Sequence, residues 1–495
     1  MSETVAEHTG GTFCPKANRH FVLIAAILAS AMGFIDGSVV SIAMPSLMAD
    51  LDARIAQGIW INNGYMLPLS ALVLVGGALG DVYGQRRSFI AGIFLFVIAS
   101  ALCAVAPNAD LLIAARVVQG IGAAIMVPGS LAILAKAYPK EERGAAIGTW
   151  AAASAVTTAL GPMVGGLVLQ TLGDSAWRLI FAINLPIGAF AVFLLWRLVP
   201  DDEADGGRSP DWVGALFISI ALLLLAYGLA APEGEESSVA SASQIISFSL
   251  PALIAFALFL WWESRAPAPM VPLRLFASST FSGANILTFS FYFGLSAVLF
   301  FLPITMIDAW GVGQLQVALA FLPISVAIGL LSGFVGRLAD RVGPAPLLTT
   351  GSITVAIAYV GLALAAPMQS FWLSVLPFLS LTAIGLALVV SPLSTAVMTS
   401  VDETNTGSAS GVNNAVSRVA GLFAVALMGL LAATVYNGSV GVTPGDYGLS
   451  SAAENADAHS QAMTAAFQAV ALVAAALSFI SAAVAWLMIR KPPSS

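Results

Sequence analysis

The stretch that decides the fold reads Gly77-Ala78-Leu79-Gly80-Asp81-Val82-Tyr83-Gly84-Gln85-Arg86-Arg87. It joins two long apolar runs and is too short to form a domain. The same skeleton returns as Gly336-Arg337-Leu338-Ala339-Asp340-Arg341-Val342-Gly343, so both copies read G-x-L-x-D-x-x-G. A polar connection repeated between apolar segments predicts two related halves, since internal repeats are typical of secondary transporters. The alternative is two unrelated tight turns.

The composition places the chain in a membrane. Of its 495 residues, 59% are hydrophobic and 9% are charged, against about 25% charged in soluble domains. The apolar segments approach or exceed ~20 residues, the length of a helix that crosses the hydrocarbon layer. A β-barrel would show short alternating segments instead. We therefore predict an all-α integral membrane protein.

We expect about fourteen transmembrane helices, arranged as two six-helix bundles with two additional central helices. The expected domains are a cytoplasmic tail (1–20), an N-terminal bundle (21–199), a linker with the two additional helices (200–280), a C-terminal bundle (281–489) with an extracellular loop (436–462), and a second cytoplasmic tail (490–495).

The basic residues set the orientation, because Lys and Arg gather on the cytoplasmic side of membrane proteins. With the N-terminus inside, fifteen of the nineteen Lys and Arg lie on the cytoplasmic side and two on the outer side. This asymmetry predicts an even number of spans and both termini in the cytoplasm. We expect the protein to reside in the cell inner (plasma) membrane.

Several function classes are excluded by what the sequence lacks. The three histidines (His8, His20 and His459) fall in the tail, at a helix end and in an outer loop, so we expect no histidine-based active site and no metal centre. No Gly-Lys pair forms an ATP-binding P-loop, and nothing points to nucleic acid. We therefore expect no enzyme, no cofactor and no ATP, and transport driven by an ion gradient.

Asp36 is the clearest candidate for chemistry. It lies fifteen residues into the first span, about 22 Å along the helix. Charges inside a membrane are expensive and usually functional, and a buried carboxylate can exchange a proton near neutral pH. Asp36 could therefore hold a proton or a cationic substrate in turn. The alternative is an acid paired with a neighbouring Asn or Arg for structural reasons.

Two arginines also fall within spans. Arg116 either organises a polar network with Gln119 and the first span, relaying protonation to conformation, or bonds to backbone carbonyls of a neighbouring helix. Arg418 lies near mid-depth, its role in coupling is less defined, and it is a candidate for the cavity wall. Asp308, near the outer end of its span, is either interfacial or a second proton site.

Two further groups of residues are candidates for a pivot between the halves and for the walls of a substrate cavity. Gly161, Pro162, Gly165 and Gly166 lie deep in the fifth span and predict a pivot between the halves, or plain helix packing. Aromatic and amide side chains would suit a flat apolar ligand as a set, although packing alone explains each singly. They are Trp60, Asn62, Asn63, Tyr65, Phe289, Tyr292, Asn413 and Asn414.

These motifs together resemble the major facilitator superfamily, specifically its fourteen-helix drug:proton antiporter branch, over nearly the whole chain. Gly77 to Arg87 is similar to the signature loop between helices two and three, with Gln85 in place of the usual arginine. Ile35-Asp36 through Pro45 resembles the first-helix motif, and Trp177-Arg178 the beginning of the sixth helix. The fourth-helix motif is matched by Leu112, Arg116, Gln119, Gly120, Gly122, Ala123 and Ala124. The fifth-helix antiporter motif is matched by Gly161, Pro162, Gly165 and Gly166, with Thr157 replacing an earlier glycine.

The resemblance implies rocker-switch exchange, in which protons enter as substrate leaves. Asp36 would accept the proton and Arg116 would couple it. The cytoplasmic latch would comprise Gly77, Asp81, Gly84, Arg86, Arg87, Asp340 and Arg341. We expect a monomeric exporter of drugs or other lipophilic, cationic compounds. The alternatives are an exporter of an endogenous metabolite (amino acid, siderophore or antibiotic) and a membrane sensor that does not transport.

Overall fold

The computed structural model describes residues 13–53, 55–202, 211–230, 242–267, 269–312, 314–402, 405–440 and 456–489. Its first half contains α1 (Arg19–Asp50), α2 (Ile55–Tyr83), α3 (Gln85–Ala104), α4 (Ala109–Ala137), α5 (Lys140–Leu172), α6 (Trp177–Ala182) and α7 (Asn184–Leu198). Two central helices follow, α8 (Trp212–Ala230) and α9 (Ala242–Glu263). The second half contains α10 (Ser279–Ile304), α11 (Gln314–Val342), α12 (Pro344–Ala365), α13 (Leu376–Thr399), α14 (Thr406–Val440) and α15 (Ala456–Met488).

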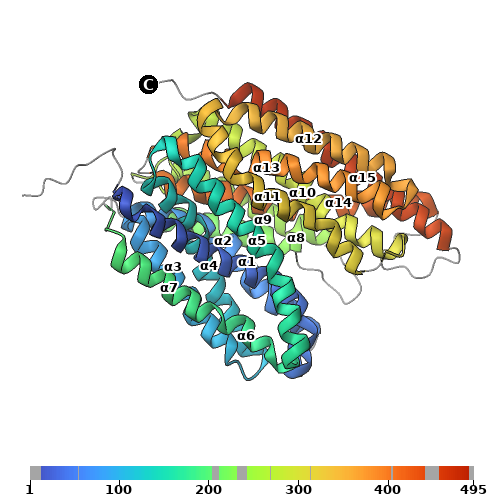
Figure 1. Ribbon diagram of the computed structural model, residues 1–495, viewed down its shortest axis with the longest axis horizontal. Coiled ribbons are helices and arrows are strands. Elements are labelled where there is room, and N and C mark those ends of the chain that lie inside the picture. The colour runs from blue at the N-terminus through green and yellow to red at the C-terminus, as the bar shows by residue number, and fades with distance from the viewer. Residues whose placement is uncertain are drawn as a thin grey trace, which may run out of the picture.

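The helices form two bundles that lie side by side (Figure 1). In the first, α4 packs along α2 and α3, and α1 packs along α5 and α7. In the second, α15 packs along α10 and α12, and α13 packs along α11 and α12. The bundles meet where α5 packs on α11 and where α2 packs on α14. The helices α8 and α9 form a hairpin whose first member lies on α2 and α14.

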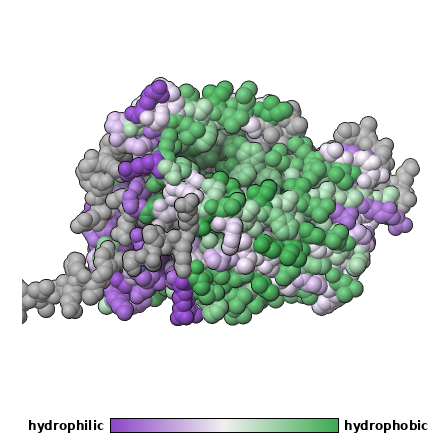
Figure 2. Space-filling view, turned by 90° about the horizontal axis from the view of Figure 1, so that it is seen from above, coloured by the Kyte–Doolittle hydropathy of each residue, from purple (hydrophilic) through white to green (hydrophobic). Residues whose placement is uncertain are grey.

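The face seen in Figure 2 is apolar over most of its breadth, with hydrophilic residues gathered towards one side. Leu330, Leu364 and Trp486 are among the large side chains that face outward. In water this would be an unstable arrangement, whereas in lipid it needs no cover, because lipid tails are as apolar as these side chains. The chain is therefore a multi-pass membrane protein, and the all-helical prediction is confirmed.

Twelve helices of the described ranges are long and apolar enough to cross a membrane, fewer than the fourteen expected. The described part of the structure therefore shows twelve candidate spans, and the fourteen-span arrangement stays a prediction.

Candidate functional site

A fully buried ion pair lies inside the first bundle. The Arg116 guanidinium on α4 pairs with the Asp36 carboxylate on α1, and both side chains are shielded from solvent. Gln119, one helical turn beyond Arg116, accepts a hydrogen bond from the guanidinium at 2.7 Å and donates one to Asp36 at 2.9 Å. Both carboxylate oxygens are thereby bonded. A buried pair needs such additional hydrogen bonds, since desolvating two charges otherwise outweighs their attraction.

The pair belongs to a network that crosses the bundle. The Arg116 Nε donates to the carbonyl of Ile61 on α2 at 3.1 Å, and the Tyr65 ring lies 4.2 Å from the guanidinium carbon. On the other side, Gln119 donates to the Ser100 hydroxyl at 2.8 Å, and Asn184 donates to the same hydroxyl at 3.2 Å. A change in charge at Asp36 would therefore alter contacts that involve α1, α2, α3, α4 and α7.

A cavity of about 410 Å³ lies between the two bundles. Trp150 on α5 lines it and donates to the Ser30 hydroxyl on α1 at 2.8 Å. Polar residues from the second bundle include Tyr292, Asn413, Asn414, Ser417 and Arg418. The apolar walls include Phe34, Val127, Leu131, Ile324, Ile328 and Val390.

Tyr65 separates the ion pair from this cavity. It lines the cavity and also stacks against Arg116, whereas Asp36 is fully buried and does not belong to the lining. Any substrate in the cavity would therefore meet Tyr65 first and would not contact the carboxylate directly.

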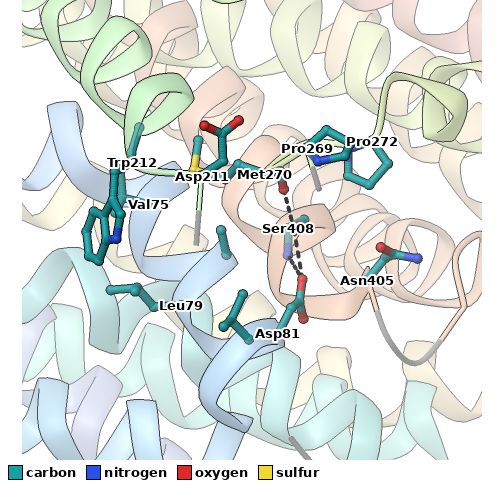
Figure 3. Close-up of a pocket in the computed structure, with 13 residues that line it drawn as sticks. Val75, Leu79, Asp81, Asp211, Trp212, Pro269, Met270, Pro272, Asn405 and Ser408 are labelled. Atoms are coloured by element: carbon teal, nitrogen blue, oxygen red, sulfur yellow. Dashed lines mark hydrogen bonds between the residues drawn. The ribbon is translucent and has the colours of Figure 1, made fainter. Parts of the chain in front are cut away.

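The first copy of the repeated motif bridges the two bundles at one end. Asp81 at the end of α2 accepts a hydrogen bond from the backbone N–H group of Gly407 at 2.7 Å. It also accepts hydrogen bonds from the backbone N–H group of Ser408 at 2.7 Å and from the Ser408 hydroxyl at 2.8 Å (Figure 3). These donors form the N-terminus of α14, where the helix dipole favours a negative charge. The Ser408 hydroxyl lies within 2.9 Å of the Met270 carbonyl as well, so the segment after α9 also contacts this bridge.

The second copy makes the reciprocal bridge. Asp340 at the end of α11 accepts from the backbone N–H groups of Gly144 at 3.1 Å and Ala145 at 3.2 Å, in the second turn of α5. Each motif aspartate thus binds the start of a helix in the opposite bundle. Both bridges lie at the predicted cytoplasmic end of the molecule. Their hydrogen bonds hold the two halves together there.

The glycines of the motif permit this close contact. A Cβ placed on Gly77 would collide with the Gly407 carbonyl, and one on Gly336 would collide with the Gly144 carbonyl. The last glycine of each motif has a different role. Gly84 has φ of 92° and Gly343 has φ of 87°, a conformation that strains any residue with a side chain.

The arginines of the predicted latch lie elsewhere. Arg86 pairs with Asp201 and donates to the Leu195 carbonyl at 2.8 Å, and Arg87 pairs with Asp201 at 3.1 Å. The hydrogen bond from Arg87 lowers the pKa of Asp201. These contacts stay near the first bundle, and Arg341 is exposed at the end of α11. Gln85, which replaces an arginine of the motif, donates to Asp81 at 2.9 Å.

A family model described as the Major Facilitator Superfamily matches residues 26–425. The chain belongs to the Major Facilitator Superfamily. Its members are transporters, which agrees with the prediction that the chain is no enzyme.

Two relatives of this chain are named for drug resistance or drug efflux. The chain is 32% identical to the methylenomycin A resistance protein of Bacillus subtilis, with 84% of this chain and 89% of that protein covered. It is 33% identical to the drug efflux pump JefA of Mycobacterium tuberculosis, with 82% and 80% covered. A solved structure of the proton:xylose symporter XylE shares the fold, with a TM-score of 0.63, 15% identity and 96% of each chain covered.

The remaining residues predicted for the cavity and the pivot, and Asp308, lie in different parts of the structure. Tyr65, Tyr292, Asn413, Asn414 and Arg418 meet in the central cavity. Asn62 and Asn63 are half-buried on α2 outside its lining. Trp60 lies 6.3 Å from the Tyr227 ring of α8, and Phe289 lines a separate apolar cavity beside α8 and α9. The side chains of Pro162 and Asp308 and the surroundings of Gly161, Gly165 and Gly166 lie outside the described part of the chain.

Sequence reasoning missed the partners of the signature loop. Asp202 accepts from the backbone N–H groups of Gln85 at 2.7 Å and Arg86 at 3.0 Å, and pairs with Lys136 at 3.2 Å. With Asp201 it fixes the start of α3, although both residues read as part of an acidic linker. A usable signal was the pair of acids directly after the sixth span, close to a loop with two arginines.

Proposed function

We propose that this chain exports drug-like compounds by proton-coupled, alternating-access antiport. The observation that carries the proposal is the Asp36–Arg116–Gln119 network, which buries one proton-accepting group beside the central cavity. The drug resistance and efflux relatives support the class of cargo, because they align over most of the chain.

The proton and the substrate would bind at different places. Protonation of Asp36 would remove the charge that holds Arg116, and Arg116 contacts both Ile61 and Tyr65 of α2. Helix α2 also carries Asp81, which bridges to α14. We infer that protonation changes the position of α2 and thereby the stability of the bridge, so coupling would be conformational.

The two reciprocal bridges would be the cytoplasmic latch of this cycle. While Asp81 and Asp340 hold the two helix starts, the cavity would be closed to the cytoplasm. Breaking both bridges would open it for loading. Gly161, Pro162, Gly165 and Gly166 remain our proposal for the pivot.

We also propose a fourteen-span topology with both termini in the cytoplasm and a functional monomer. Helices α5 and α8 would complete the fourteen, beyond the twelve candidate spans. The many small and hydroxylated residues of α5 suit a helix packed against α11 and α1, where it meets protein rather than lipid. The pair α8 and α9 would sit at the α2–α14 seam, so we retain the predicted boundary of that insertion at residues 200–280.

Everted vesicles that contain the full chain test the proposal. An imposed pH gradient, acidic inside, should drive uptake of fluorescent drug-like probes taken from anionic, neutral and cationic classes. The Asp36→Asn variant should lose gradient-driven uptake of whichever probe the intact chain moves. The matched control is Asp52→Asn, an exposed acid at a left-handed backbone position that Asn also tolerates. Uptake that survives in Asp36→Asn would remove Asp36 from coupling.

A further inference from the structure

The central cavity carries a single uncompensated charge. Arg418 on α14 is the one charged residue among the described residues that line it. Its Nε atom is buried, and no group in the described part of the chain accepts a hydrogen bond from it. Buried polar atoms are nearly always bonded, so an unbonded guanidinium nitrogen beside a cavity indicates a position that a ligand completes.

The acid that could neutralise Arg418 is committed elsewhere. Both oxygens of Asp36 are bonded to Arg116 and Gln119, and Asp36 does not line the cavity. The expectation of a cationic substrate depended on a carboxylate exposed to that substrate. Because the carboxylate is enclosed, the charge presented to a ligand comes from Arg418.

The surroundings of Arg418 add neutral polar groups and apolar walls. Asn414 lies four residues before Arg418 on α14, Ser417 directly precedes it, and all three residues line the cavity. The same cavity is lined by the aromatic residues Tyr65 of α2 and Phe34 of α1. One cation set in an otherwise neutral, largely apolar chamber fits a molecule with an apolar body and one anionic end.

We propose that the transported compound is an amphipathic organic anion whose carboxylate, or another oxyanion, pairs with Arg418. The planar guanidinium suits this task because it can give two parallel hydrogen bonds to a carboxylate. The assignment rests on the proposed function, since it names the class of cargo for the same cavity. It reverses the sign of the charge expected from the sequence.

Three dansyl probes with the same fluorophore separate the charge classes. Dansylglycine carries a carboxylate, dansylamide is neutral, and dansylethylenediamine carries an ammonium group. Binding to the purified full-length protein in detergent can be followed by dansyl emission excited through tryptophan, since Trp150 lines the cavity. We expect the order of affinity to be dansylglycine, then dansylamide, then dansylethylenediamine.

Variants of Arg418 assign the preference to this residue. Arg418→Gln should weaken dansylglycine binding by about tenfold to a hundredfold, the range for hydrogen bonds to a charged group, and should leave dansylamide nearly unchanged. Arg418→Lys keeps the positive charge but cannot give two parallel hydrogen bonds to a carboxylate. Its affinity for dansylglycine should therefore lie between those of the intact chain and Arg418→Gln. Arg197→Gln removes the same charge from an exposed site on α7 and should bind like the intact chain.

Two results would overturn the assignment. One is an intact chain that fails to bind dansylglycine more tightly than dansylamide. The other is a preference for dansylglycine that persists in both Arg418→Gln and Arg418→Lys. Because these measurements need no gradient, anion binding at Arg418 without gradient-driven transport would refute the proposed function alone. Gradient-driven export of dansylethylenediamine, indifferent to Arg418→Gln, would refute this assignment alone.

Discussion

Replacing Asp81 by Ala should open the end of the molecule that the repeated motif closes. The change removes three hydrogen bonds to the start of α14. Hydrogen bonds to a charged group contribute about 1.5–3 kcal/mol each. The freed N–H groups regain water once the seam opens, so we expect a net loss of about 3 kcal/mol, or roughly a hundredfold shift towards the open state.

A cysteine in the cavity reports this shift. Ser394 on α13 lines the cavity, and Ser394→Cys can be alkylated by a membrane-impermeant maleimide. Both native cysteines, Cys14 and Cys103, are buried, so they should react slowly. In everted vesicles, Asp81→Ala should raise the alkylation rate about a hundredfold or to the limit of the reagent. In right-side-out vesicles the rate should fall or stay constant.

The control is Asp402→Ala, which removes an exposed acid shortly before α14. It should leave the rate near that of the parent. Unchanged labelling in Asp81→Ala, or an equal rise in Asp402→Ala, would show that the hydrogen bonds to Gly407 and Ser408 do not hold the seam.

Three further predictions follow from other contacts. Gly336→Ala should raise the same labelling rate, because its Cβ would collide with the Gly144 carbonyl; a rate equal to the parent would show that the seam tolerates a methyl group. Arg116→Gln should lower the melting temperature, since leaving Asp36 buried and unpaired costs about 3–5 kcal/mol. Adding Asp36→Asn to this variant should restore part of the lost stability. A double variant that is less stable than Arg116→Gln alone would contradict this explanation. Asp201→Asn should lower the melting temperature at neutral pH but not in strong acid. The pKa of Asp201 is lowered from 3.8 in the folded state by Arg87 and Arg86, so its contribution is complete above about pH 4 and disappears as the pH falls through the lowered value. A difference that persists in stronger acid would exclude this pair as its cause.

The sequence predicted those features that depend on local pattern or on depth in the membrane. Apolar length identified most of the helices, and the repeated G-x-L-x-D-x-x-G predicted two halves that now show reciprocal contacts. Asp36 and Arg116 stand out in the sequence because charges inside a membrane are expensive and usually functional. The structure brings both residues and Gln119 into one network. Their role in coupling stays a prediction.

Long-range partners could not be predicted in the same way. Asp81 binds backbone groups of Gly407 and Ser408, and a backbone N–H leaves no mark in the sequence. The sequence predicts Arg86 and Arg87 as part of the latch, whereas in the structure both pair with Asp201. The charge of the cavity was also hidden, because it depends on Asp36 being enclosed while Arg418 faces the open space.

The central claim is that substrate binding and proton binding exclude each other through Asp36. The most direct measurement is proton release from the purified full-length protein, in weakly buffered detergent solution with a pH indicator, when a transported compound is added. We predict release from the intact chain and from Asp52→Asn, and none from Asp36→Asn. The absence of release from the intact chain, or equal release from Asp36→Asn, would contradict the account.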